Sequence, residues 1–501
     1  MNRSEAESQQ EHFDVIVVGA GITGINAAYH LAKQRPNNSL LVLETFETFG
    51  GTWWSHKYPG IRSDSDLYTF GYQFKPWVGP PIATAEEIRA YMGEVIEENG
   101  LDQHIRYRHS ISAASWSSEQ NLWTITATKL ETGDEIHFTT NFLYMGQGYY
   151  RHKEGFWPDW QDMDSYKGQL THSEEWPDDL DYTDKNVLVI GSGASAATLV
   201  PNMSEKAAHV TMLQRSPTFF LTGRNAIEIA DQLRALEIDE TWIHEVTRKQ
   251  QLLNGAEFAK RCLAEPEVVK QELIGALRAV LGDDYDVDTH FTPNYRPWRQ
   301  RIAFVPESDL FKTIASGDAT VVTDEIERFT QNGVLLKSGQ ELEADLIVAA
   351  TGFNLNVLGD IAFTVDGQLV DAHDTLTYRG MMLTGMPNLV FVFGYLRASW
   401  TLRADLVADF TCRLLDHMDT AKARAVTVTP KPEDIGMETN GFIADDDFNP
   451  NYVKRKLHLL PKSGAKPEWQ HSQDYWSDKN AFPAIDLSGA EFVYRGKADK
   501  N

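Results

Sequence analysis

The sequence predicts an α/β fold made of two similar β-α-β units and a helical insertion. Two short apolar runs, residues 14–18 and 186–190, each end at a glycine-rich loop that opens a segment with helical periodicity. After the second unit, residues 225–251 and 265–282 form long amphipathic stretches with few helix breakers. The chain has 501 residues, whereas a single core stops growing at about 250 to 300. We therefore expect at least two packed domains.

The first unit carries the loop "GAGITG" directly after the apolar run "DVIVV". Gly19 permits the tight turn, Gly21 lets backbone amides approach a pyrophosphate, and Gly24 allows close packing of helix against strand. The next strand ends at Glu44, whose carboxylate can accept hydrogen bonds from a ribose diol but would repel a 2′-phosphate. This unit predicts a Rossmann-like site for FAD or NAD.

The second unit repeats the pattern in "GSGASA", with Gly191 and Gly193 on either side of Ser192. Its following strand ends in Arg215 instead of an acid, and arginine suits a 2′-phosphate, which favours NADPH. The alternative to a 2′-phosphate contact is that Arg215 only occupies the solvent-exposed end of a strand. Because two dinucleotide sites imply one bound redox group and one transient hydride donor, we expect FAD and NADPH in a flavin oxidoreductase.

Composition excludes several other classes of protein. A formal net charge of -26 argues against nucleic acid as a partner. Cys262 and Cys412 are too far apart in sequence for a redox pair, and we find no metal-ligand spacing. The first residues have no apolar leader, and no uninterrupted apolar run approaches the roughly 18 residues that span a bilayer. We expect a cytoplasmic protein without stable membrane insertion.

The segment "YKGQLTHSEEWP" resembles the fingerprint of the class B flavoprotein monooxygenases, in which Tyr166, Gly168, His172 and Trp176 match the fixed positions. In that family a final tryptophan followed by proline is typical of the type I Baeyer-Villiger enzymes. The resemblance implies use of NADPH and molecular oxygen to convert ketones to esters or lactones through a flavin peroxide, and oxidation of sulfides as well. The alternative is a flavin monooxygenase that oxygenates only nitrogen or sulfur nucleophiles.

A second fingerprint of the same family resembles residues 50–66, "GGTWWSHKYPGIRSDSD". Both glycine loops, both fingerprints and "ATG" at 350–352 occur in the family's order, so the resemblance covers nearly the whole chain. The segments "YPGIRSDSD" and "HVTMLQRSPT" are similar in sequence to those of a mycobacterial subgroup of the family.

The resemblance also implies the catalytic residues. Arg301 stands where the family has its active-site arginine, and Asp64 matches the carboxylate that holds it. Four alternatives stay open, and one of them is that Arg301 sits in a structural ion pair. Asp64 is also placed to cap a helix, Trp53 and Trp176 are also suited to an ordinary core, and His172 is better suited to orienting the link between domains than to proton transfer.

The predicted cofactor contacts are Gly19, Gly21, Gly24, Glu44, Gly51, Thr52, Trp53, Asp64, Trp176, Gly191, Ser192, Gly193, Arg215, Ser216 and Gly352. The predicted domains are the first part of an FAD-binding domain (1–150), the first part of an NADPH-binding domain (151–222), a helical insertion (223–300), the second part of the NADPH-binding domain (301–345), and the returning FAD-binding domain with a C-terminal segment (346–501). The insertion is either a mobile lid or a structural flank. The sequence predicts no particular substrate or oligomeric state.

Overall fold

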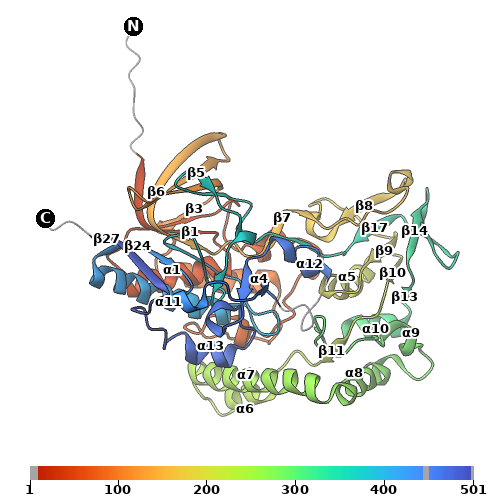
Figure 1. Ribbon diagram of the computed structural model, residues 1–501. Coiled ribbons are helices and arrows are strands. Elements are labelled where there is room, and N and C mark those ends of the chain that lie inside the picture. The colour runs from red at the N-terminus through yellow and green to blue at the C-terminus, as the bar shows by residue number, and fades with distance from the viewer. Residues whose placement is uncertain (1–9, 444–450, 498–501) are drawn as a thin grey trace, which may run out of the picture.

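The computed structural model describes residues 10–443 and 451–497. The outer ends of the predicted ranges 1–150 and 346–501 lie outside these residues. Most of the N-terminal segment for which we expected no apolar leader lies outside them as well. Two lobes lie side by side, and long helices run along the lower edge of both (Figure 1). Among the described residues, no helix combines the length and the apolarity needed to cross a bilayer.

The first lobe is built on a nine-stranded sheet in the order β20-β19-β4-β5-β6-β1-β2-β3, with β23 paired to β6. These strands are β1 (Glu11–Val18), β2 (Leu40–Leu43), β3 (Ile105–Arg106), β4 (His109–Ser117), β5 (Leu122–Lys129), β6 (Asp134–Met145), β19 (Ala362–Val365), β20 (Gln368–Leu369) and β23 (Leu389–Phe391). Helix α1 (Ile22–Gln34) follows the first glycine loop and packs against α11 (Thr401–Ala421).

The second lobe is built on a five-stranded parallel sheet in the order β13-β10-β9-β17-β8. Its strands are β8 (Gln169–His172), β9 (Asn186–Ile190), β10 (His209–Gln214), β13 (Ala319–Thr323) and β17 (Leu346–Ala349). Helix α5 (Ala194–Ser204) follows the second glycine loop.

Strand β17 corrects one part of the predicted domain organisation. The sequence assigned it to the returning first domain, but Ile347 pairs with Leu188 of β9 and with Leu170 of β8. An apolar strand that is buried on both faces has the same pattern in either parallel sheet, so the pattern alone does not choose between them. The chain leaves the second lobe only after this strand.

Two short strands connect the lobes. Strand β7 (Tyr150–Gly155) leads out of the first lobe, β18 (Phe353–Leu355) leads back, and the two pair antiparallel. Between β7 and β18 the chain also forms a three-stranded sheet of β14 (Ile326–Phe329), β15 (Gly333–Leu336) and β16 (Glu341–Glu343). The smaller remaining elements are α2 (Thr52–Ser55), α4 (Ala85–Glu98), α12 (Asn451–Lys454), α13 (Tyr475–Ala481), β21 (Thr377–Tyr378), β22 (Met382–Leu383), β24 (Ala423–Val428), β25 (Thr439–Gly441), β26 (Lys462–Gly464) and β27 (Phe492–Lys497).

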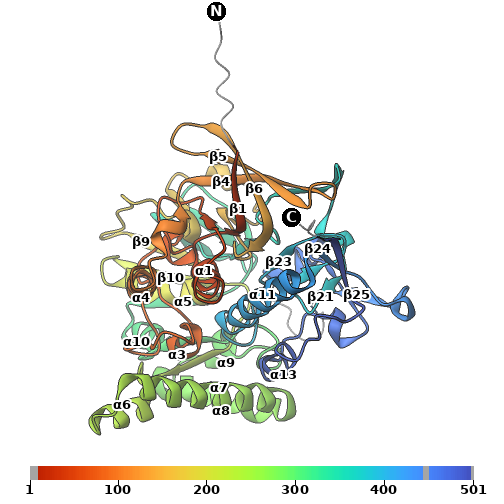
Figure 2. The same ribbon diagram turned by 90° about the vertical axis from the view of Figure 1, so that its left-hand side faces the viewer.

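The predicted insertion is helical and lies along both lobes (Figures 1 and 2). It contains α6 (Glu228–Ala235), α7 (Glu240–Ala264), α8 (Pro266–Leu281) and α9 (Val287–Phe291), and it begins and ends beside the paired strands β11 (Phe220–Gly223) and β12 (Ala303–Pro306). Asp239 caps α7, and Pro266 starts α8. Helix α7 contacts α3 (Leu67–Phe70) in the first lobe, and α8 packs on α10 (Asp309–Ser316) in the second.

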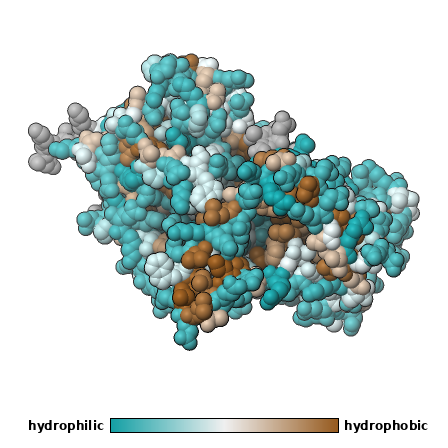
Figure 3. Space-filling view, turned by 90° about the horizontal axis from the view of Figure 1, so that it is seen from below, coloured by the Kyte–Doolittle hydropathy of each residue, from teal (hydrophilic) through white to brown (hydrophobic). Residues whose placement is uncertain are grey.

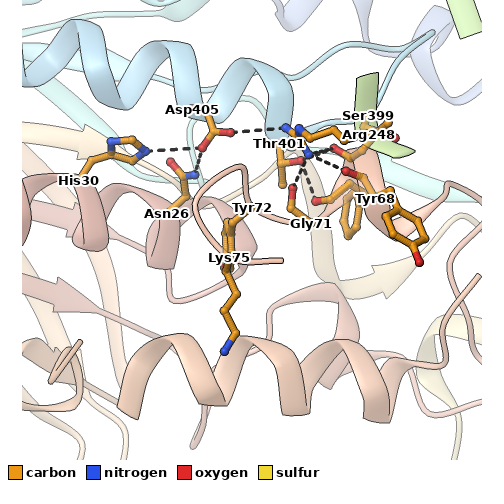
Figure 4. A network of polar contacts seen from close by, with 12 residues as sticks. Asn26, His30, Tyr68, Gly71, Tyr72, Lys75, Arg248, Ser399, Thr401 and Asp405 are labelled. Carbon is orange, nitrogen blue, oxygen red and sulfur yellow. Dashed lines mark hydrogen bonds and ion pairs between the residues drawn. The ribbon is translucent and has the colours of Figure 1, made fainter. Parts of the chain in front are cut away.

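A buried polar network anchors α7 to the first lobe (Figure 4). The Arg248 guanidinium donates hydrogen bonds to the carbonyl oxygens of Tyr68 at 2.8 Å and Gly71 at 3.1 Å. It also lies 3.9 Å from Asp405 of α11, which accepts a hydrogen bond from Asn26 of α1. Breaking such a network would leave a buried charge without compensation, which is costly. For α7, this favours the structural flank over the mobile lid.

Candidate functional site

A cavity of about 1000 Å³ lies between the two lobes and reaches both glycine loops. The predicted residues on its wall are Gly19, Gly21, Glu44, Gly51, Thr52, Trp53, Asp64, Gly191, Ser192, Gly193, Arg215, Ser216, Arg301 and Gly352. Gly24 and Trp176 are the predicted cofactor contacts that do not line it. Tertiary folding therefore brings together side chains from both ends of the chain at one site.

The first glycine loop is closely packed. Gly19 has a φ of +92°, a conformation that favours glycine. A Cβ placed on Gly24 would lie 1.8 Å from the carbonyl oxygen of Gly19, so Gly24 serves helix packing and not the cavity wall. Glu44 is buried at the end of β2, where its carboxylate accepts hydrogen bonds from the amides of Ala20 at 2.6 Å and Phe46 at 2.8 Å. Burial raises the pKa of Glu44.

The second glycine loop is closely packed at Gly191, where a Cβ would lie 2.3 Å from the carbonyl oxygen of Ala350, and is open at Gly193. A Cβ placed on Gly193 would meet no other atom within 4 Å. The Ser192 hydroxyl lies 2.9 Å from the Thr218 hydroxyl, and Arg215 is exposed on the cavity wall at the end of β10. A diphosphate could therefore approach the backbone of this loop directly, with a cation beside it.

Residues 50–66 connect the first lobe to the second. Tyr58 belongs to the hydrophobic core of the second lobe. Gly60 has a φ of +74°, and a Cβ on it would lie 2.1 Å from the side chain of Asn202 in α5, so this close approach favours glycine. Arg62 binds the carboxylate of Asp309 through both terminal guanidinium nitrogens, one of them at 3.1 Å. This segment therefore forms an interdomain contact along one side of the cavity.

The same segment ends in a bidentate ion pair between Asp64 and Arg301. Nε and Nη2 of Arg301 donate to the two carboxylate oxygens of Asp64, each at 2.6 Å, and Nη2 also donates to the Ser65 hydroxyl at 3.0 Å. Burial acts to raise the pKa of Asp64, but the charge and hydrogen bonds of Arg301 outweigh it, so this pKa lies below its ordinary value. Asp66 caps α3 by accepting from the Thr69 amide at 3.0 Å, so the helix-capping role belongs to Asp66 and not to Asp64.

His172 is buried beside the strands that connect the lobes. A Cβ on Gly155 of β7 would lie 2.1 Å from its imidazole ring. Its Nδ1 accepts from the Glu174 amide at 3.1 Å, and its Nε2 faces the Thr351 hydroxyl at 3.3 Å. Burial lowers the pKa of His172 to about 4, so the ring is neutral at neutral pH. These contacts fit the interpretation that His172 orients the link between domains.

The two tryptophans with alternative interpretations lie in different surroundings. Trp53 lines the cavity and meets the Phe70 ring edge to face, with centroids 5.7 Å apart. Trp176 lies off the cavity wall and packs on the second core, where its ring centroid is 6.4 Å from that of Tyr182. The structure therefore brings Trp53 to the candidate site, whereas the position of Trp176 fits the core interpretation.

Sequence reasoning missed an aromatic wall of the cavity. Tyr149 stacks on Trp400 with centroids 4.7 Å apart, and Tyr150 stacks on Phe353 at 3.8 Å. The signal available in the sequence was the position of "GQGYY" directly after β6, because ligands bind beyond the carboxyl ends of parallel strands. Trp400 and Phe353 come from distant segments, and no local pattern places them there.

Comparisons with known proteins agree with this arrangement. A family model for the NAD(P)-binding Rossmann-like domain matches residues 17–78. A model for L-lysine 6-monooxygenase/L-ornithine 5-monooxygenase matches residues 84–355. The FAD-containing monooxygenase EthA of Mycobacterium tuberculosis (strain ATCC 25618 / H37Rv) is 43% identical over 489 residues, which cover 97% of this chain and 98% of that protein. The chain belongs to the FAD-containing monooxygenases.

Solved structures support the fold of this monooxygenase. An oxidized steroid monooxygenase bound to NADP has a TM-score of 0.73 at 22% identity, covering 96% of this chain and 99% of that one. OTEMO in complex with FAD and NADP has a TM-score of 0.72 at 19% identity, covering 97% and 100%. The predictions of two Rossmann-like units, of a flavin monooxygenase and of a mycobacterial subgroup are thus confirmed.

Proposed function

We propose that this chain is a Baeyer-Villiger monooxygenase that contains FAD, depends on NADPH and molecular oxygen, converts ketones to esters or lactones, and also oxidises sulfides. The observation that carries the proposal is the bidentate Asp64–Arg301 pair on the wall of a cavity between two dinucleotide loops. The steroid monooxygenase described above is bound to NADP, and OTEMO is in complex with FAD and NADP. These bound nucleotides support the choice of cofactors.

The residues of the cavity fit both cofactors. FAD suits the first loop, because Gly19 and Gly21 line the cavity without a side chain and Glu44 presents a carboxylate to a ribose. NADPH suits the second loop, where Gly193 faces open space and Arg215 offers a cation to a 2′-phosphate. When bound, the two cofactors would together supply hydride transfer and the activation of oxygen.

Arg301 is suited to stabilise negative charge on oxygen during the reaction. Its guanidinium stays protonated at any working pH, and Asp64 holds two of its nitrogens in a fixed plane. The lowered pKa of Asp64 keeps that carboxylate ionised near neutral pH. A cation that is already oriented needs little reorganisation when charge develops, and this is a large source of catalysis in enclosed sites. We therefore assign Arg301 the catalytic role and Asp64 the positioning role.

The aromatic wall has a second role in the same proposal. Tyr149, Tyr150, Phe353 and Trp400 offer rings to the part of the cavity that lies beside the first loop. Rings that exclude water from the cavity strengthen the interaction between Arg301 and a developing negative charge. They also provide an apolar surface for the carbon skeleton of a ketone or a thioether.

Oxygenation of nitrogen or sulfur alone is the second candidate function. The match of residues 84–355 to the L-lysine and L-ornithine monooxygenase model favours it. The two candidates differ in whether a carbonyl carbon is attacked, and only the carbonyl reaction forms a tetrahedral adduct whose oxygen needs a cation such as Arg301.

Product analysis with labelled oxygen separates the two candidates. The purified yellow protein is incubated with NADPH, ¹⁸O₂ and a simple aliphatic ketone, and in parallel with a thioether. We expect an ester that carries one labelled oxygen, together with a labelled sulfoxide. Sulfoxide without ester across a series of ketones would replace the proposal with the second candidate. Steady NADPH consumption with neither product would reject both.

A further inference from the structure

The outer face of α7 carries a helical stripe that the described part of the chain leaves largely exposed. One face of this helix packs on the first lobe through Ile243, Thr247 and Arg248, which are buried. The opposite face presents seven residues at alternating spacings of four and three: Trp242, Val246, Lys249, Leu253, Ala256, Lys260 and Leu263. Such a 4-3 spacing is the pattern by which one helix packs along another.

Three of the apolar members of this stripe are strongly exposed, whereas Val246 is 38% exposed and Ala256 is half-buried. Trp242 is 68% exposed, Leu253 is 59% and Leu263 is 53%. Leu236, between α6 and α7, and Val268 of α8 extend the apolar surface beyond the two ends of the stripe. Figure 3 shows hydrophobic residues gathered on the underside of the molecule, the side that α7 occupies in Figure 1. Contiguous exposed apolar surface of this kind marks an interaction site.

We propose that this stripe is a homodimer interface, in which α7 packs antiparallel against α7 of a second copy of the chain. A twofold axis near the middle of the helix brings Trp242 within one turn of the partner's Leu263. It brings Lys249 within one turn of the partner's Glu257 and Lys260 within one turn of the partner's Glu245. The two glutamates flank the stripe on the same helix, so the charge pattern complements itself.

The charges also decide the direction of packing and the kind of partner. A parallel pair would place Lys249 against Lys249 and Lys260 against Lys260, which is unfavourable. Within one chain, Lys249 lies 4.0 Å from Glu245, and both are solvent-exposed enough that this contact contributes little. Glutamates beside the stripe and a net charge of -26 disfavour an anionic lipid surface. A second copy of the chain would cover the apolar residues of the stripe and pair with its lysines.

The full-length holoenzyme tests this proposal by sedimentation velocity over a range of concentrations. We expect a species of twice the chain mass, and we expect Leu253→Glu to raise its dissociation constant by roughly 30-fold or more, as truncation of a central interface residue does. The matched control is Leu369→Glu, because Leu369 is 73% exposed on β20 and lies outside the stripe. Thermal unfolding of each variant shows that its fold is intact.

A charge exchange tests the antiparallel arrangement itself. Glu245→Lys and Lys260→Glu should each weaken the dimer, and the double variant should restore it, because each partner then offers the reversed pair. A monomer at every concentration overturns the proposal, and so does a dimer that Leu253→Glu leaves unchanged. Failure of the double variant to restore the dimer overturns the antiparallel arrangement. A monomer that co-sediments with phosphatidylcholine vesicles, and loses this binding on Leu253→Glu, assigns the stripe to a lipid surface instead.

Discussion

The two glycine loops share one sequence pattern, yet the structure surrounds them differently. In the first loop, a Cβ on Gly19 would lie 3.1 Å from Gln147, and a Cβ on Gly21 would lie 3.6 Å from Gly51. In the second loop, a Cβ on Gly191 would lie 2.3 Å from the Ala350 carbonyl oxygen, so both loops are tight at their first glycine, whereas a Cβ on Gly193 would meet nothing within 4 Å. The acid that follows the first loop, Glu44, is buried, whereas the arginine that follows the second, Arg215, is exposed.

This difference fits the two kinds of cofactor that a flavin monooxygenase uses, one that stays bound and one that exchanges in each cycle. A prosthetic group that stays bound through many turnovers gains from an enclosed loop, because burial of its surface slows dissociation. A hydride donor that must enter and leave in each cycle needs an open loop, and a charged contact at the rim gives selectivity without slow release. We propose that the surroundings of Gly21 and Gly193, and not the glycine motif that they share, distinguish the resident cofactor from the exchanging one.

The largest expected effect comes from adding one methyl group to each loop. In Gly24→Ala the new Cβ would lie 1.8 Å from the Gly19 carbonyl oxygen, so we expect loss of bound FAD and a large fall in thermal stability. The variant Gly193→Ala, in the second loop, has room for its Cβ. This variant should keep its fold and its flavin. It should bind NADPH on the order of tenfold more weakly, because the added methyl group makes the backbone of the second loop less accessible to the diphosphate.

Flavin absorbance, thermal unfolding and NADP⁺ titration by fluorescence measure these outcomes. Equal loss of flavin from both variants would contradict the difference between the loops.

The second prediction concerns the ion pair that lies between the loops. Arg301→Ala should lower the rate of ester formation by about 100 to 1000-fold, because a preorganised cation is lost, while flavin content stays unchanged. Arg301→Lys keeps the charge but loses the bidentate contact with Asp64, so its rate should fall between those of the parent and the alanine variant. Ester formation at the parental rate in Arg301→Ala would remove Arg301 from the mechanism.

The third prediction concerns His172, which is buried beside the strands that connect the two lobes. His172 is held neutral, with a pKa of about 4 against an ordinary value of 6.5. Between these values the unfolded chain binds the additional proton, so the free energy of unfolding should fall as pH drops from 6.5 to 4, by up to about 3 kcal/mol from this residue. Urea unfolding across this range measures the slope.

His172→Gln should flatten that slope, whereas His137→Gln, which alters an exposed histidine, should leave it unchanged. An unchanged slope in His172→Gln would show that other groups cause the acid sensitivity.

The smallest expected effect belongs to the exposed arginine of the second loop. Arg215→Ala should reduce the preference for NADPH over NADH by roughly tenfold, because it removes a charge-assisted contact with the 2′-phosphate. The rate with NADH should change little. Ratios of kcat/KM for the two nucleotides measure the effect, and an unaltered ratio would support the alternative of an ordinary solvated strand end.

Local patterns predicted much of the fold correctly. The expected helix "ITGINAAYHLAKQ" is α1, Ile22–Gln34, and the expected strand "NVLVI" is β9, Asn186–Ile190. Both succeed because a buried strand followed by a glycine turn and an amphipathic helix satisfies its packing within about thirty residues. The long stretches at 225–251 and 265–282 also proved helical, for the same local reason.

Predictions that depended on distant partners succeeded less often. The apolar strand β17 has no local feature that selects the sheet of the second lobe, and its neighbours β9 and β8 begin more than 150 residues earlier. Trp176 carries a family fingerprint, but its packing on Tyr182 keeps it off the cavity wall. The sequence left a helix cap open as an alternative role for Asp64, and only the folded chain shows that Asp64 binds Arg301 whereas Asp66 caps the helix.

By itself, the sequence determined the two Rossmann-like units, the glycines of both loops, and the positions of Glu44 and Arg215 at the ends of the strands that follow those loops. These features act over short stretches of chain, where hydrogen bonding and periodicity are local. Only the tertiary structure decided that residues 50–66 join the lobes, that Asp64 meets Arg301 across 237 positions, and that α7 is anchored on one face and exposed on the other. Those outcomes depend on which buried surfaces meet, and only the packed whole specifies that.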